Sequence, residues 1–342
     1  MKKSLFFLAI VVGLQGSIGS SFARPIHSDL SPEMTVAVSA PLSNFWLQTP
    51  QTIEDWEKIQ KGYVASATVN NLKLAKSLGV QIFEEKMNGI PVFILQPKHT
   101  KKNAKNKVIL YFHGGGYVLG HGRSGLGEAI LMAGLEGYKL VCVDYRMAPQ
   151  HPFPAAIDDA LTVYKALLAQ YDPQDITVFG TSTGGGMALV LPIQAHQNKL
   201  PMPAAIIAGT PWSELGKKGD SYFVNDKVDN ILGTYDGMID AAAKAYANGH
   251  DYQSPLVSPV NASNDTLKAF PPTLLISGTR DLFLSNTVRM HRNLLRNKVP
   301  TDLLVYEGLS HAQYYLVPKA PETKEHYEFM SDFLNRVWSS KH

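Results

Sequence analysis

The sequence predicts an α/β fold in which a mostly parallel sheet is covered by helices on both faces. Two observations lead to this prediction. Short, continuously apolar runs recur along the chain, and amphipathic helical stretches separate most of them. Of the 342 residues, 45% are apolar and 18% are charged, a composition that is typical of globular proteins and excludes intrinsic disorder.

The expected strands follow one another from Gly79 onward. Residues 80–83 and 91–95 flank Asn88-Gly89, a dipeptide that favours a tight turn, so the first two strands should form a hairpin. Six buried strands follow, at residues 108–112, 140–143, 176–179, 205–207, 273–276 and 303–306. Helices are expected around residues 154–171, 184–198, 286–297 and 321–338. The chain therefore predicts an eight-stranded sheet, with ligands binding at the carboxyl ends of its strands.

Two segments interrupt this alternation, and we expect both to pack over one end of the sheet as a helical cap. Residues 24–78 and 212–268 favour helix, are rich in aromatic residues and lack a strong strand. They divide the chain into four parts: an N-terminal cap segment (24–78), a first core part (79–211), an inserted cap segment (212–268) and a second core part (269–342).

Residues 1–23 have the organisation of a secretory signal peptide. Lys2 and Lys3 precede an apolar run from Leu5 to Leu14, and Ser21-Phe22-Ala23 places small residues at a cleavage position. The run is too short for a transmembrane helix, which needs about 20 residues. We therefore expect export to the periplasm or the medium, with no stable membrane span after cleavage. An uncleaved membrane anchor is the alternative.

Charge and cysteine content exclude further classes. Cleavage after residue 23 would remove two lysines and no acids, which lowers the formal net charge from +3 to +1 and leaves nucleic-acid binding without support. The single cysteine, Cys142, can form neither an internal disulfide nor a cysteine-based zinc site. No H-E-x-x-H motif is present, so we expect no metal and no cofactor. The oligomeric state stays open and includes a homodimer.

The first motif that carries chemistry is Gly180-Thr181-Ser182-Thr183-Gly184, between an expected strand and an expected helix. A G-x-S-x-G sequence in this setting is typical of a nucleophile elbow. Its small residues let the tight turn pack backbone against backbone, and the serine hydroxyl stays exposed. Ser182 is therefore the expected nucleophile, and a chance match in a glycine-rich turn is the alternative.

A second motif, His113-Gly114-Gly115-Gly116, follows the strand expected at 108–112. Consecutive glycines let backbone N–H groups converge on one substrate oxygen, as an oxyanion hole requires. We expect the N–H groups of Gly115, Gly116 and Thr183, with Gly114 nearby, to form this hole. A phosphate-binding loop is excluded. The lysine that a Walker-type loop needs is replaced by His121, and the last glycine of a dinucleotide-binding G-x-G-x-x-G motif is replaced by Leu119.

A serine nucleophile on this kind of sheet needs an acid and then a histidine further along the chain. Asp281 follows the strand expected at 273–276, and His311 follows the last strand. We therefore predict the catalytic triad Ser182, Asp281 and His311. Glu307 is the competing acid, but it precedes His311 by only four residues, and a solvated loop carboxylate is its expected role.

Together these motifs resemble the hormone-sensitive-lipase-like branch of the α/β-hydrolase fold, which includes bacterial acetyl-esterase-like enzymes. The resemblance runs from about Gly79 to the C-terminus and also rests on segments 144–149, 255–259, 278–281 and 308–311. It implies an α/β-hydrolase fold with a helical cap. It also implies a serine carboxylesterase that forms an acyl-enzyme on small-molecule esters of short to medium chain length, without a cofactor.

Three positions depart from the family pattern. Thr181 and Thr183 stand where the elbow usually has Asp and Ala, and Ser285 stands where a second acid usually follows Asp281. Thr183 still supplies its backbone N–H, Thr181 cannot carry the charge of the aspartate, and Ser285 is expected to N-cap the next helix. Two other functions share these motifs: an amidase or deformylase using the same triad, and a non-catalytic ligand-binding protein on this fold, against which His311 argues.

Overall fold

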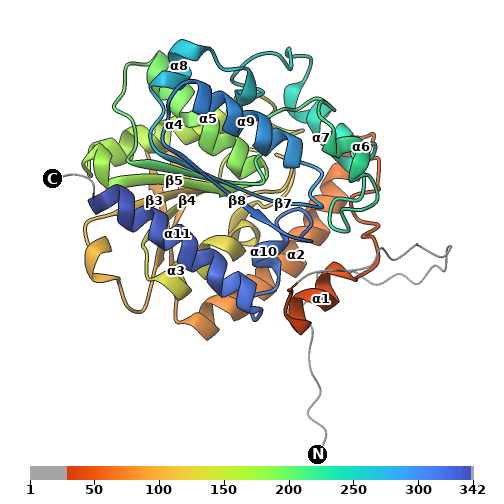
Figure 1. The fold of residues 1–342 in the computed structure, drawn as a ribbon, viewed down its shortest axis with the longest axis horizontal. Coiled ribbons are helices and arrows are strands. Elements are labelled where there is room, and N and C mark those ends of the chain that lie inside the picture. Colours follow the sequence, from red (N-terminus) through yellow and green to blue (C-terminus); the bar gives the residue numbers. More distant parts are fainter. Residues whose placement is uncertain (1–28, 340–342) are drawn as a thin grey trace, which may run out of the picture.

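A computed structural model describes residues 29–339, so the signal peptide expected at 1–23 lies outside the described residues. An eight-stranded sheet of order β1-β2-β4-β3-β5-β6-β7-β8 forms the centre of the fold (Figure 1). The chain pairs antiparallel from β1 through β2 to β4, and the remaining neighbours are parallel. The predicted mostly parallel α/β sheet is confirmed. Its strands are β1 (Gln81–Met87), β2 (Ile90–Gln96), β3 (Val108–Phe112), β4 (Leu140–Val143), β5 (Ile176–Thr181), β6 (Ala205–Gly209), β7 (Thr273–Gly278) and β8 (Thr301–Tyr306).

The predicted hairpin is also present. Met87 of β1 pairs with Ile90 of β2, and the two turn residues between them, Asn88 and Gly89, both have positive φ, at 48° and 87°. A tight hairpin turn of this hand needs positive φ at both positions, which Asn and Gly tolerate best.

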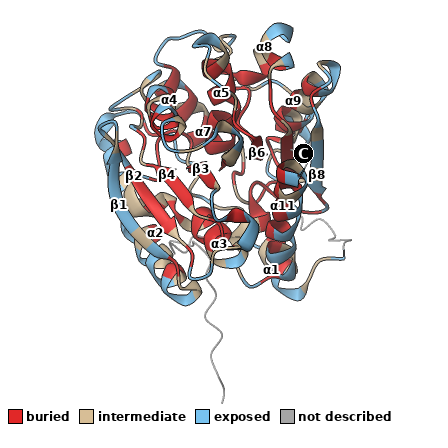
Figure 2. Ribbon diagram, turned by 90° about the vertical axis from the view of Figure 1, so that its left-hand side faces the viewer, coloured by how far each residue is buried: buried red, intermediate tan, exposed pale blue. Residues whose placement is uncertain are grey.

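Helices cover both faces of the sheet and create two separate apolar cores (Figure 1). One face carries α3 (Gly127–Glu136) and α11 (Pro321–Ser339), and the other carries α4 (Ala155–Leu168), α5 (Thr183–Gln197) and α9 (Leu284–Arg296). Alternate residues of a strand point to opposite faces. Accordingly, Leu110 packs into one core and its neighbour Tyr111 into the other. The central strands are buried, whereas the edge strands β1 and β8 are largely exposed (Figure 2).

The two cap segments contact each other through the backbone. The first contains α1 (Pro32–Val38) and α2 (Ile53–Leu78), and the second contains α6 (Ser221–Val224), α7 (Met238–Ala247) and α8 (Asn264–Lys268). The N–H of Ser43 donates to the carbonyl of Asn230, and the N–H of Met238 donates to that of Trp46. The remaining short helix, α10 (Gln313–Leu316), follows the loop after β8. Among residues 29–339, no helix has the length and apolar character needed to cross a membrane.

Candidate active site

Ser182 lies at the sharp turn between β5 and α5, with φ 62° and ψ −123°. Positive φ is uncommon for a residue with a side chain and marks local strain. The surrounding glycines are required by packing. A Cβ atom on Gly184 would lie 2.0 Å from the carbonyl oxygen of Phe112, and one on Gly180 would lie 2.5 Å from the carbonyl carbon of Gly184. Ser182 is partly exposed, whereas both of its sequence neighbours are buried. The turn therefore presents the serine side chain at the surface of a tightly packed backbone.

The glycine-rich loop after β3 lies directly against this turn. A Cβ atom on Gly114 would lie 3.2 Å from the Ser182 Cβ, and Gly115 and Gly116 have positive φ, at 120° and 68°. Within residues 29–339, the N–H groups of Gly115 and Gly116 donate to no protein acceptor. Thr183 is the first residue of α5, where a helix leaves its N–H groups without intrahelical partners. These three N–H groups are the ones predicted to receive a substrate oxyanion.

The His113 side chain packs against this loop. Its ring stacks on Tyr145 with a centroid separation of 4.1 Å, and its Nδ1 lies 2.8 Å from the carbonyl oxygen of Gly114. A Cβ atom on Gly120 would come within 2.3 Å of the same nitrogen, so the loop closes tightly over the ring. Burial lowers the pKa of His113, which favours the neutral imidazole. His113 therefore belongs to the packing of the loop.

Asp281 and His311 form a buried pair at the ends of β7 and β8. The Asp281 Oδ1 lies 2.9 Å from the His311 Nδ1 and also accepts the N–H of Phe283 at 2.8 Å, while the Oδ2 accepts the Ser277 hydroxyl at 2.8 Å. This arrangement places the imidazole proton on Nδ1 and leaves Nε2 as a basic nitrogen. Within the described residues that Nε2 is buried and has no hydrogen-bond partner. Glu307, the competing acid, is exposed.

An aromatic chain links the serine turn to this pair. The carbonyl of Ser182 accepts the N–H of Trp212, whose ring stacks on Phe283 at 5.5 Å. Phe283 in turn meets the His311 ring edge-on, at 4.8 Å. Across residues 29–339 no hydrogen bond joins Ser182 to His311, and catalytic hydrogen bonds often tighten only when substrate is bound.

Comparison with known proteins identifies this arrangement. The family described as "alpha/beta hydrolase fold" matches residues 109–315. The chain belongs to this family. An acetyl-hydrolase of Streptomyces hygroscopicus is 28% identical over 229 residues, covering 67% of this chain and 75% of that protein. An esterase of Acinetobacter venetianus is 30% identical over 234 residues, covering 68% and 75% of the two chains.

Solved structures show which branch of the α/β-hydrolase family this chain resembles. A crystal structure of an esterase aligns with TM-score 0.87 and 36% identity over 94% of this chain and 98% of that one. An esterase from the bacterial hormone-sensitive lipase family aligns with TM-score 0.75 and 26% identity, over 90% and 99% of the two chains. The hydrolase therefore lies in the hormone-sensitive-lipase-like esterase branch, as the sequence resemblance implied.

The structure resolves what Thr181 does in place of the family aspartate. Its hydroxyl donates to the Glu128 carboxyl at 2.5 Å, and the other oxygen of Glu128 accepts the Tyr111 hydroxyl at 3.1 Å. Thr181 also lies 3.4 Å from the hydroxyl of Tyr314, three residues beyond His311. Burial raises the pKa of Glu128 to about 8. A carboxyl from α3 therefore lies beside Thr181 at the elbow, and sequence reasoning missed it.

A second carboxyl missed by sequence reasoning, Asp229, comes from the inserted cap segment. It lies beside the predicted acid–base pair: one possible metal-ligand atom from each of Asp229, Asp281 and His311 lies within 4.8 Å of the other two. The Asp229 oxygens, however, accept four backbone N–H groups, and the Asp281 oxygens accept the three hydrogen bonds described above. The carboxylate oxygens of this cluster are therefore already hydrogen-bonded, which disfavours a cation between them.

The expectation for Ser285 was wrong. Helix α9 begins at Leu284, one residue earlier, and its N-cap position is Phe283. Ser285 instead exchanges two hydrogen bonds of 2.9 Å with Ser221 of the inserted cap segment. The residue that replaces the family acid therefore fastens the cap to the core.

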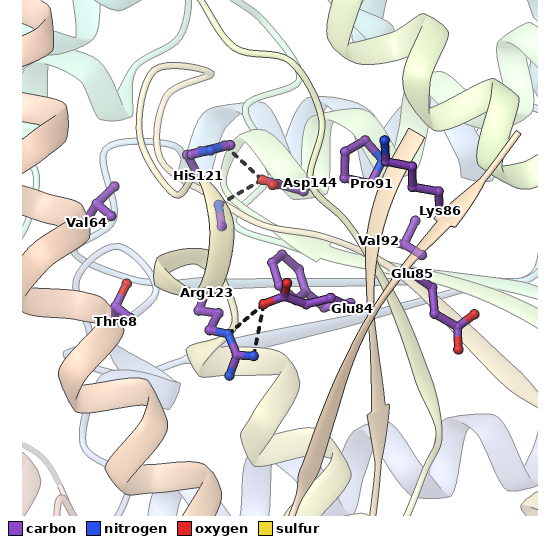
Figure 3. Close-up of a pocket in the computed structure, with 12 residues that line it drawn as sticks. Val64, Thr68, Glu84, Glu85, Lys86, Pro91, Val92, His121, Arg123 and Asp144 are labelled. Carbon is purple, nitrogen blue, oxygen red and sulfur yellow. Dashed lines mark hydrogen bonds and ion pairs between the residues drawn. The ribbon is translucent and has the colours of Figure 1, made fainter. Parts of the chain in front are cut away.

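A surface cavity of about 660 Å³ lies between α2, the β1–β2 hairpin and the loop after the glycine-rich motif (Figure 3). Two pairs of charged groups line it: the His121 Nδ1 lies 3.1 Å from Asp144, and Arg123 lies 2.9 Å from Glu84. Asp144 also accepts the N–H of Gly122 at 2.8 Å. No residue predicted for catalysis lines this cavity.

Proposed function

We propose that this hydrolase is a serine carboxylesterase that works through an acyl-enzyme on Ser182. The observation that carries the proposal is the Asp281–His311 pair, which leaves a buried, unpartnered Nε2 as a base. In the first step that nitrogen takes the hydroxyl proton of Ser182 while the Ser182 oxygen attacks the ester carbonyl carbon. The carbonyl oxygen becomes negative and accepts hydrogen bonds from the N–H groups of the glycine-rich loop and Thr183.

The second half of the cycle reverses these proton movements. His311 gives its new proton to the departing alcohol oxygen as the ester bond breaks, and Asp281 stabilises the intervening imidazolium. Water then loses a proton to His311 and attacks the acyl carbon. The bond between the acyl carbon and the Ser182 oxygen breaks as His311 returns the proton to that oxygen, which releases the acid and restores Ser182.

The test of this mechanism is Ser182→Ala. We expect turnover of a nitrophenyl ester to fall by about 10⁶, by analogy with triad deletions in a serine protease. An organophosphonate should label wild type at Ser182 and leave the variant unlabelled. Hydrolysis by the variant within tenfold of wild type would overturn the mechanism, and a wild type that binds esters without labelling would point to a binding protein.

For the substrate, we propose esters with short to medium acyl chains. The support comes from relatives called acetyl-hydrolase and esterase, together with the family resemblance of the sequence. A series of nitrophenyl esters from acetate to palmitate should give the highest kcat/KM in its shorter half, and a maximum at palmitate would contradict the proposal. Matched amides, run beside the esters, should be hydrolysed far more slowly; equal rates would favour the amidase alternative.

We also propose that residues 1–23 direct export, on the basis of their charged start, short apolar run and small-residue cleavage position. N-terminal sequencing of the protein expressed in a bacterial host should find Arg24 as the first residue in the periplasmic or extracellular fraction. Recovery of an uncleaved chain in the membrane fraction would support the anchor alternative.

A further inference from the structure

Asp229 is a fully buried carboxylate that belongs to the inserted cap segment yet contacts both loops of the acid–base pair. Its Oδ1 accepts the N–H groups of Ile231 and Leu232 within its own turn, both at 3.0 Å. Its Oδ2 accepts the N–H of Leu282 at 2.9 Å and the N–H of His311 at 3.3 Å. One carboxylate oxygen thus bridges the residue after the predicted acid and the predicted base itself.

Neighbours of Asp229 reinforce the same bridge. The Asn225 side-chain amide donates to the carbonyl oxygen of Asp281 at 2.9 Å. The Asn230 N–H donates to the Ser310 hydroxyl at 3.2 Å, and the Asn230 side-chain oxygen accepts from Gln313 at 3.3 Å. Residues 225–230 therefore contact the acid loop and the histidine loop at several separate points.

The charged groups that face Asp229 are Asp281 from the acid loop and His311 from the histidine loop. Within residues 29–339 no Lys or Arg side chain pairs with Asp229. Among the described residues, its counter-charge is therefore the one that appears on His311 when that imidazole takes the serine proton. A fixed negative charge is stabilising where positive charge develops in a dry site.

We propose that Asp229 is a positioning residue of the catalytic triad, which fixes the acid and histidine loops relative to each other and places a second carboxylate beside the His311 imidazolium. The inference rests on the proposed serine esterase mechanism. Asp229 touches neither substrate nor the reacting atoms, so it acts through Asp281 and His311.

The proposal has a consequence for the pH profile. Burial and the charge of Asp281 raise the pKa of Asp229 to about 6, while the positive form of His311 opposes the shift. Below that pH, Asp229 gains a proton and loses its charge. Activity should then fall because the second carboxylate beside the imidazole has lost its charge, in addition to the loss that protonation of any general base causes in acid.

The experiment compares Asp229→Asn with Asp240→Asn, which removes an equally negative side chain from the cap, where Asp240 pairs with Lys244. In Asp229→Asn an amide NH₂ faces one pair of backbone N–H donors. We expect kcat to fall about 10- to 100-fold with KM within twofold, because small displacements of catalytic groups slow the reaction by such factors. Asp240→Asn should match wild type. An Asp229→Asn variant with wild-type kcat would overturn the proposal.

The acid limb of kcat/KM separates positioning from simple loss of stability. Wild type should approach a two-proton slope below pH 6, and Asp229→Asn should show one proton. If Asp229→Asn fails to fold by circular dichroism, the wild-type limb decides alone: a one-proton slope refutes the inference. Failure of the proposed mechanism is distinguishable, because wild type would then lack Ser182-dependent hydrolysis at every pH.

Discussion

Replacing Glu128 with Gln should change how the stability of the hydrolase depends on pH. The Glu128 carboxyl is buried, and its partners are the neutral hydroxyls of Thr181 and Tyr111. Its pKa rises from an ordinary 4.5 to about 8, with burial as the main cause. Between these pH values the folded chain holds a proton that the unfolded chain releases. The contribution of Glu128 to the free energy of unfolding therefore falls as the pH rises from about 4.5 to about 8, and is constant on either side.

The size of this effect follows from the shift. About 3.5 pKa units at 1.36 kcal/mol each give about 5 kcal/mol lost across the window. Glutamine keeps the shape and one acceptor oxygen but does not titrate, so Glu128→Gln should lack this loss. Relative to wild type, the variant should become progressively more stable as the pH rises toward 8.

Urea unfolding followed by circular dichroism at pH 5, 6.5, 8 and 9 measures this difference. Glu57→Gln, on the exposed surface of α2, is the matched control and should parallel wild type. The reasoning is refuted if wild type and Glu128→Gln keep a constant difference in unfolding free energy from pH 5 to 9, because Glu128 would then be ionised in the folded state throughout.

Two further predictions concern the site directly. Asp281→Asn should lower kcat by about 10⁴, since the amide holds the wrong imidazole tautomer. Glu307→Gln, at an exposed position, should keep wild-type kcat. Steady-state assays on one ester check both variants, and a larger loss in Glu307→Gln would show that the acid is misassigned. Gly184→Ala should yield unfolded or aggregated protein, because its Cβ would lie 2.0 Å from the carbonyl oxygen of Phe112; a soluble variant with a wild-type melting temperature would contradict this packing argument.

Much of the fold could be predicted because it depends on local patterns. Continuous apolar runs mark the buried strands, and Asn88-Gly89 marks the hairpin turn. Helix α3 was missed because it is apolar and buried along most of its length, so the amphipathic contrast that marks a surface helix is weak. Its one acidic buried residue, Glu128, was missed with it.

Part of the candidate site could likewise be predicted from local patterns, and part could not. Ser182, Asp281 and His311 could be nominated because each follows a strand, and a parallel sheet brings its strand ends together. Asp229 could not be nominated, since it lies in an irregular stretch of the inserted cap segment, far along the chain from both loops that it joins. The only local signal is the self-contained turn Asp229–Leu232, which many surface loops share.

The contacts of Asn230 limit how a substrate can reach Ser182. The Asn230 side chain donates to the carbonyl oxygens of Ala37 at 2.9 Å and Ala40 at 3.0 Å, at the end of α1. Ser31, at the start of that helix, donates to Glu322 at the start of α11 through both its N–H and its hydroxyl. A cap that swung open as one hinged lid would break these bonds and pull the histidine loop apart. We therefore expect any opening of the cap to occur in its parts outside residues 225–230, with the residues of the predicted triad left in place.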